Sequence, residues 1–178
     1  AALTGARTVV ITEDLRPERS WNGTLNVVRK WPAEKRYFGI DASLFLTRFS
    51  NRILPDYTTD PDLILYRNLN GYGIAQGISL NLEARIGRGL KAIAGTTWMD
   101  VHTVEDGVTN EQFFAPDWQG TFALTQELPH RLAIDLTGQW YGPMRLPVQP
   151  RDFRPAHSPW YALVNVQLPD AASPERTD

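Results

Sequence analysis

The side chains best suited to binding chemistry in this chain stand in long polar stretches between alternating segments. Arginines and aromatic residues share these stretches, and together they suit capture of an anionic or aromatic chelate. The same side chains could instead only pack the loops against one another. The candidate binding residues are Tyr57, Tyr66, Arg67, Phe113, Phe114, Arg145, Arg151 and Arg154.

A run of aspartates, DYTTDPD, lies in the first of these stretches. Carboxylate oxygens are ligands that calcium prefers. The spacing does not follow the EF-hand pattern, so a solvated acidic loop is favoured over a metal site. The weak calcium candidates are Asp56, Asp60 and Asp62.

Motifs for enzyme chemistry are missing from the sequence. The chain has no cysteine, which excludes thiolate zinc sites and a cysteine nucleophile. No G-x-S-x-G elbow is present. Glu105 and Asp106 fall in an expected loop, where they favour solubility over catalysis. A zinc site formed by His102, His130 and His157 is not expected, because these residues are far apart in the sequence. The sequence predicts neither an enzyme nor a cofactor.

Composition narrows the class of protein. The 178 residues include 18 Lys and Arg against 20 Asp and Glu, so no nucleic-acid partner is expected. No stretch approaches the roughly 18–20 apolar residues that a membrane helix requires. A membrane β-barrel remains compatible, because each of its strands needs only about 9–11 residues of alternating character.

Alternation of apolar and polar residues is the main structural signal. It predicts an all-β, antiparallel up-and-down meander of seven or eight long strands. The segment at 90–99 alternates less clearly than the others, and 7–11 is the possible eighth strand. The seven long segments begin near Trp21, Phe38, Ile78, Leu90, Trp118, Leu132 and Trp160.

The connections alternate in length. Short turns are predicted near 32–35, 87–89 and 129–130, and long polar connections near 50–70, 103–116 and 142–158. In a meander this alternation places all the long loops at one end, as outer-membrane barrels do.

Each predicted strand has one polar and one apolar face. The polar face suits either a wet lumen or a solvated exterior, and it carries Asp41, Glu83, Arg85, Lys91 and Asp135. In 70–89, for example, 78–86 would present alternate apolar residues to lipid and the residues between them to a lumen. Six tryptophans border the apolar face like the aromatic girdles of membrane barrels. These are Trp21, Trp31, Trp98, Trp118, Trp140 and Trp160. The alternative is a soluble β-barrel or sandwich that binds a small ligand or glycan through its long loops.

Several motifs resemble the C-terminal barrel strands of TonB-dependent outer-membrane receptors. They are LRPERSW at 15–21, NLNG at 68–71 followed by QGISL at 76–80, and WMD at 98–100. The stretch YGPMRLPVQPRDFRPAHSPW at 141–160 resembles an external loop of such receptors from the Bacteroidetes group. The likeness covers about residues 7–168, and it rests on the order and spacing of the motifs.

The resemblance implies a receptor fragment in the bacterial outer membrane. Residues 1–168 would form part of a transmembrane barrel of about 22 strands, followed by a polar tail at 169–178. The plug, the TonB box and the last strands of the family are not found. The parent receptor would take up a ferric siderophore or a similar large nutrient by energised transport. Its partners would be outer-membrane lipid, the iron chelate or other nutrient, and the TonB complex through the missing N-terminal part.

Overall fold

The described part of the chain consists of strands and their connections. The computed structural model describes residues 8–57, 59–60, 62–87, 89–129, 132–148 and 153–168. No helix in these ranges is long and apolar enough to cross a membrane. The strands are β1 (Thr8–Ile11), β2 (Arg19–Ala33), β3 (Arg36–Asn51), β4 (Ile53–Asp56), β5 (Leu63–Asn68), β6 (Gly71–Ile86), β7 (Leu90–Glu105), β8 (Val108–Glu111), β9 (Trp118–Leu128), β10 (Leu132–Tyr141) and β11 (Tyr161–Gln167).

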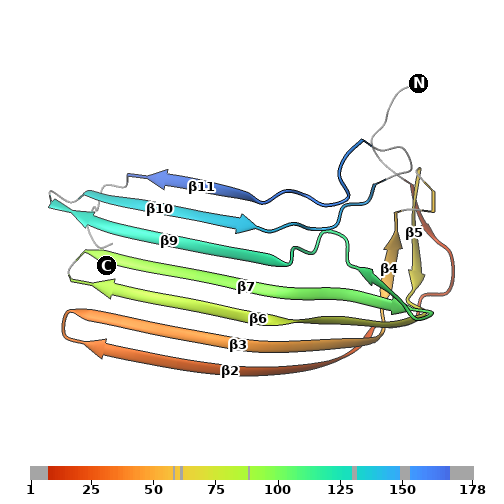
Figure 1. Ribbon diagram of the computed structural model, residues 1–178, viewed down its shortest axis with the longest axis horizontal. Helices are drawn as coiled ribbons and strands as arrows, with labels where there is room; N and C mark the ends of the chain where they lie inside the picture. The colour runs from red at the N-terminus through yellow and green to blue at the C-terminus, as the bar shows by residue number, and fades with distance from the viewer. Residues whose placement is uncertain are drawn as a thin grey trace, which may run out of the picture.

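One large antiparallel sheet dominates the fold (Figure 1). Its order is β11-β10-β9-β7-β6-β3-β2, and β8 pairs with β7 at the side of this path. Each long strand lies beside the next long strand of the chain, which confirms the predicted all-β meander. The weakly alternating segment at 90–99 is also a strand, and β7 continues beyond it to Glu105.

The predicted eighth strand at 7–11 forms, but it does not join the meander. β1 pairs in parallel with β5, which pairs antiparallel with β4. These three strands make a separate small sheet at the long-loop end (Figure 1). The apolar run in TVVI predicted a strand, but its pattern carries no information about its partner. Residue 7 lies outside the described residues.

Short and long connections lie at opposite ends of the main sheet, as predicted (Figure 1). The turn between β2 and β3 contains only Glu34 and Lys35. The long connections, however, contain β4, β5 and β8. The prediction of a continuous loop at 103–116 is wrong in its first part. There β7 and β8 form a tight hairpin around Asp106 (φ 50°) and Gly107 (φ 80°). Both turn residues have positive φ, as a type I′ turn requires.

Cross-strand hydrogen bonds cover the polar face of the main sheet. The Asn26 amide donates to the Asp41 carboxylate (2.6 Å) and to the Ser43 hydroxyl (2.8 Å). Ser79 and Thr97 share a hydrogen bond of 2.8 Å between their hydroxyl oxygens. Further along the sheet, the Thr125 hydroxyl donates to the Asp135 carboxylate at 2.6 Å. This face is therefore built for contact with water.

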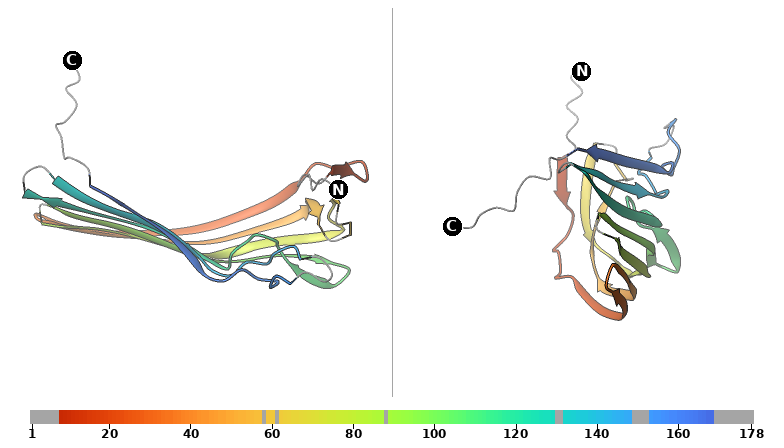
Figure 2. Two further views of the ribbon diagram at one scale, coloured as in Figure 1. Left: turned by 90° about the horizontal axis from the view of Figure 1, so that it is seen from above. Right: turned by 90° about the vertical axis from the view of Figure 1, so that its left-hand side faces the viewer.

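The opposite face is apolar and uncovered. Leu25, Leu44 and Ile78 lie side by side on it and are 62%, 49% and 50% exposed. Figure 2 shows the main sheet as a single curved layer. Among the described residues, the buried hydrophobic side chains are only Leu69 and Ala133. A soluble sandwich would cover this face with a second layer. The soluble alternative is therefore not supported, and a lipid environment fits the face.

Four tryptophans form a band across the apolar face, which we call the upper tryptophan row. Trp98 and Trp118 lie opposite each other on β7 and β9. Trp140 stacks on Trp160 with 5.8 Å between ring centroids. Trp140 also lies over Gly120, where a Cβ atom would fall 2.4 Å from the indole ring. The tryptophans bordering the apolar face were expected near strand ends, and this is wrong for Trp98, because β7 continues past the row to Glu105.

A second aromatic pair lies at the turn end of the apolar face. Trp31 on β2 stacks on Phe38 of β3 with 5.5 Å between ring centroids. Trp21 lies ten residues before Trp31 on the same strand. A tilted strand crosses a bilayer in about 9–11 residues. The stretch of β2 between these tryptophans therefore has the length of a membrane crossing.

Adjacent positions on β2 test which face meets lipid. Leu25→Arg places a cation on the apolar face, and we expect the intact protein in lipid vesicles to lose about 2–4 kcal/mol of unfolding free energy. Thr24→Arg is the matched control, because it places the same cation on the polar face and should cost well under about 1 kcal/mol. Urea unfolding followed by tryptophan fluorescence measures both. Equal losses would contradict the assignment of the faces.

Candidate functional site at the long-loop end

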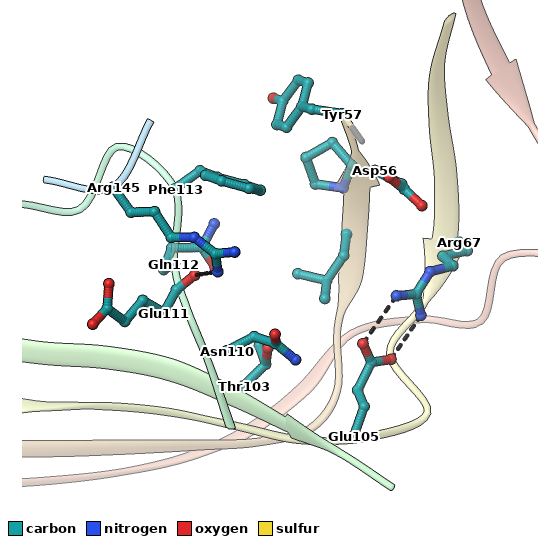
Figure 3. Close-up of a pocket in the computed structure, with 12 residues that line it drawn as sticks. Asp56, Tyr57, Arg67, Thr103, Glu105, Asn110, Glu111, Gln112, Phe113 and Arg145 are labelled. Carbon is teal, nitrogen blue, oxygen red and sulfur yellow. Dashed lines mark hydrogen bonds and ion pairs between the residues drawn. The ribbon is translucent and has the colours of Figure 1, made fainter. Parts of the chain in front are cut away.

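The three long connections meet at a small cavity on the polar face, which we call the loop pocket (Figure 3). Thr103 and Glu105 place it on this face, because they alternate in phase with Thr97 of the polar hydrogen-bond network. The cavity encloses about 190 Å³. It is lined by Leu54, Pro55, Asp56, Tyr57, Arg67, Thr103, Glu105, Asn110, Glu111, Gln112, Phe113 and Arg145.

A two-pronged ion pair joins β5 to the end of β7. Arg67 donates from Nη1 and Nη2 to the two carboxylate oxygens of Glu105, at 2.6 and 2.9 Å (Figure 3). The hydrogen bond from Arg67 lowers the pKa of Glu105; burial opposes this shift, and the Asn70 N–H adds to it. The same hydrogen bond raises the pKa of Arg67, again against the effect of burial. The pair therefore stays ionised and fixes the small sheet over the main sheet.

The residues around Asn68 explain why the NLNG stretch folds as it does. Asn68 is buried, and its amide nitrogen donates to the carboxylate of Glu13 and to the carbonyl of Asp14, both at 3.2 Å. Its side-chain oxygen accepts from the Arg16 N–H at 3.0 Å. Gly71, at φ +156°, lies so close to β7 that a Cβ atom would fall 1.9 Å from the Val104 carbonyl oxygen. Only glycine fits there.

Aromatic rings from two of the long connections form a cluster at one side of the pocket. The Tyr57 ring meets those of Phe113 and Phe114 edge-on, at centroid distances of 5.9 and 6.2 Å. Phe114 adopts a left-handed conformation (φ 60°), which is unusual for a bulky side chain. We call these three residues the aromatic wall. Such rings can stack on planar groups of a ligand.

Arg145 brings the third long connection to this wall. Its guanidinium lies 4.6 Å from the centroid of the Phe113 ring, and its Nη1 donates to the Glu111 carbonyl at 3.1 Å (Figure 3). The Phe114 N–H donates to the Arg145 carbonyl at 2.9 Å. Arg145 therefore remains close to the aromatic wall with its charge directed toward the pocket lining.

Acidic residues beside Arg145 shape the local electrostatics. His157 Nε2 lies 3.1 Å from Glu111 Oε2, which ties the 142–158 connection to β8. Burial raises the pKa of Asp117, and the negative charges of Glu111 and Asp100 raise it further, while His157 opposes the shift. This edge of the pocket is therefore rich in carboxylates.

The structure gathers half of the predicted binding residues at the pocket. Tyr57, Arg67, Phe113 and Arg145 line it, and Phe114 touches Tyr57 beside it. The others are placed elsewhere or not described. Tyr66 lies on β5 opposite Ile11, Arg154 is exposed in the last connection, and Arg151 is outside the described residues.

The candidate calcium ligands have other hydrogen bonds in the turn after β4. The two carboxylate oxygens of Asp56 accept from the N–H and the hydroxyl of Thr59, at 3.0 and 2.6 Å. Asp60 accepts from the Asp62 N–H at 2.8 Å. Within the described ranges, no three acidic or histidine side chains gather as a metal site would need. The geometry therefore gives the calcium prediction no support.

Glu105 has a structural role that its predicted position in a loop did not indicate. It was predicted to be a solubilising loop residue, but it ends β7 and holds Arg67. The signal was present in the Asp106-Gly107 dipeptide, which is a strong hairpin signature between alternating segments. Read as a hairpin, it would have placed Glu105 in a strand on the polar face.

Size and charge limit what the loop pocket can bind alone. Ligand sites commonly enclose about 300–1,000 Å³, so this cavity can hold only part of a large ligand. Its lining has three carboxylates, on Asp56, Glu105 and Glu111, against two arginines. Since Arg67 is paired with Glu105, Arg145 and the aromatic wall are the groups best placed to meet a ligand.

Comparisons with known proteins agree with the fold. Residues 2–171 match the family described as TonB dependent receptor-like, beta-barrel. No curated protein matches the sequence. Several solved structures are similar in fold.

The FrpB iron transporter of Neisseria meningitidis, F3-3 variant, is similar with a TM-score of 0.58 and 15% identity over 90% of this chain. FpvAI, from its complex with pyocin S2, is similar with a TM-score of 0.63 and 16% identity over 85% of this chain. The ferric-catecholate import receptor Fiu of E. coli K12 gives 0.61 and 18% over 87%. This chain spans 24%, 20% and 21% of those chains.

The ion pair between Arg67 and Glu105 predicts how the small sheet responds to mutation and pH. Glu105→Gln should lower local stability at β5 by about 1–2 kcal/mol, since a partly exposed charge-assisted pair is lost. Because the pKa of Glu105 is lowered by folding, the parent should keep this contribution at neutral pH. The parent should lose this contribution to stability as the pH falls below the ordinary carboxyl range and through the lowered pKa of Glu105. Hydrogen exchange of the β5 amides measures both effects.

Glu83→Gln is the matched control for this substitution. It removes an ion pair with Arg85 on the same strand (2.9 Å), which joins no separate elements. Exchange at β5 should therefore not change. Equal protection of β5 in the Glu105→Gln variant and the parent would show that the pair does not hold the small sheet.

Proposed function

Because the chain belongs to the TonB-dependent receptor-like β-barrel family of the bacterial outer membrane, we propose that it is part of a receptor for energised uptake of a ferric siderophore or similar large nutrient. This family consists of transport receptors and not of enzymes. The strands described here would form part of the barrel wall, and their long connections would form part of the external binding surface. On this proposal residues 1–168 are partial barrel and 169–178 a polar tail.

One structural observation carries the proposal beyond the family. Three connections far apart in the sequence bring the aromatic wall and Arg145 together on the polar face, beyond the upper tryptophan row. A receptor that draws its ligand from outside needs its binding groups at that end, facing the lumen. The aromatic rings would contact planar groups of the chelate, and Arg145 would pair with an anionic group.

The remaining candidates have supporting parts in this proposal. Arg67 holds the small sheet through Glu105, so it would position the wall more than touch the ligand. Tyr66, Arg151 and Arg154 would reach a ligand only if it extends beyond the pocket. Outer-membrane lipid would surround the apolar face, and the TonB complex would bind through another part of the receptor.

Removal of the aromatic wall tests the proposal. Tyr57→Ala combined with Phe113→Ala should weaken binding of a ferric catecholate to the intact receptor in detergent by about tenfold or more, since central aromatic side chains at binding surfaces commonly contribute over 1 kcal/mol each. Titration followed by tryptophan quenching measures this. Tyr37→Ala is the control, because Tyr37 lies on the polar face at the turn end.

The nature of the ligand can be tested at Arg145. Arg145→Gln should weaken binding of an anionic ferric catecholate more than that of a neutral ferric hydroxamate, because only the former gains from the charge. If neither chelate binds the parent, or if the aromatic double variant binds as well as the parent, the proposed ligand class is wrong.

A further inference from the structure

Arginines without carboxylate partners gather at the β2 side of the main sheet. Two adjoining grooves share Arg19 and Ser50; one also contains Arg48, and the other Arg16. Neither groove has an acidic residue in its lining, in contrast to the loop pocket with its three carboxylates. The nearest acid in sequence, Glu18, accepts a hydrogen bond from the Ile53 N–H at 2.9 Å. The grooves are therefore positively charged.

The groove with Arg48 opens on the apolar side of the sheet. Arg48 lies directly opposite Trp21, and both alternate in phase with Leu25 and Leu44 of the lipid-facing surface. The pairing of β2 with β3 is irregular between Arg19 and Ser20. An irregularity of this kind redirects side chains at the end of a strand. Here Arg19 and Arg48 line one groove together with Trp21, which lies between Arg19 and Leu25 along β2 and at the same level as Arg48.

The Arg48 guanidinium is held in place without being neutralised. The Arg48 guanidinium lies 5.0 Å from the centroid of the Tyr72 ring. Among the described residues, neither Arg19 nor Arg48 forms an ion pair. A site with two unpaired arginines costs free energy unless an anion or water approaches them. The groove encloses about 350 Å³, which is ample for a phosphate group.

We propose that Arg19 and Arg48 bind a phosphate of a phosphorylated lipid headgroup in the outer leaflet. The arginine fork matches the geometry of phosphate oxygens, and Ser20 and Ser50 line the same groove. The lipid origin of the phosphate follows from position, because the groove is continuous with the lipid-facing surface at the level where headgroups begin. Trp21 marks this level, as interfacial tryptophans do. This inference requires the membrane location but not the uptake of an iron chelate.

A third arginine on the same face supplies a control. Arg29 also points to the apolar side of β2, where it lies 5.7 Å from the ring centroid of Trp31 at the turn end. It therefore stands at the opposite boundary of the membrane. Arg29→Gln changes the net charge by the same amount as each single substitution in the groove, but it leaves the groove intact.

The experiment measures how much lipid the intact receptor retains. The receptor is purified in mild detergent, incubated with bisphosphorylated lipid A and examined by native mass spectrometry. We expect the Arg19→Gln, Arg48→Gln double variant to retain about tenfold less lipid A than the parent. Arg29→Gln should retain about as much as the parent. Dephosphorylated lipid A should be retained poorly by all variants.

Three results would overturn the inference. The double variant could retain as much lipid A as the parent, or Arg29→Gln could lose as much as the double variant, which would indicate only bulk charge. Inorganic phosphate at about 10 mM serves as a competitor. If it displaces the lipid, the groove is an anion site without lipid preference. If the double variant does not fold, the Arg19→Lys, Arg48→Lys pair replaces it. That pair should retain an intermediate amount, since lysine keeps the charge but loses the fork.

Discussion

Hydrocarbon offers a strand no hydrogen-bonding partner, so every backbone group inside a membrane must pair with a neighbouring strand. The sheet that results has two faces, and alternate residues along each strand must suit two different solvents. In this chain Leu25, Leu44 and Ile78 meet on one face, while Asn26, Asp41 and Ser43 bond to one another on the other. A shift of one residue in any pairing would exchange these faces. The rest of the structure depends on this register.

Beyond the upper tryptophan row the same constraint no longer applies. Water is available there, so strands can pair across loops, change partners and carry charges on either face. β7 continues seven residues past Trp98 to Glu105, whose carboxylate pairs with Arg67 of a different sheet. The loop pocket forms in this region because most of its lining comes from the long connections, whose irregular backbone would leave polar groups unpaired against hydrocarbon. Position along the strand therefore separates the part that fits a membrane span from the part that is proposed to bind a ligand.

Local pattern decides which parts of this fold can be predicted from the sequence. Alternation indicated all seven long strands, and it separated the two faces of all of them except the weakly alternating segment at 90–99, because side-chain period and solvent are linked residue by residue. The partner of β1 could not be predicted, because the four residues of TVVI, three of them apolar, fit many edges equally well. The pairing of Arg67 with Glu105 spans 38 residues and depends on how two loops fold together. For the loop pocket, the sequence indicated the types of residue and the end of the sheet, but not the contacts.

The loop pocket is incomplete as a binding site for a large chelate. Its volume of about 190 Å³ is below that of common ligand sites, and its carboxylates outnumber its arginines. An anionic ligand must therefore be attracted by groups beyond this lining, or be recognised mainly through its aromatic faces. The chain spans about a fifth to a quarter of the similar receptors, so most of the wall around a ligand would come from elsewhere in such a protein. The aromatic wall then contributes shape and stacking at one side of the ligand, and the balance of charge must be set by the surfaces that face it.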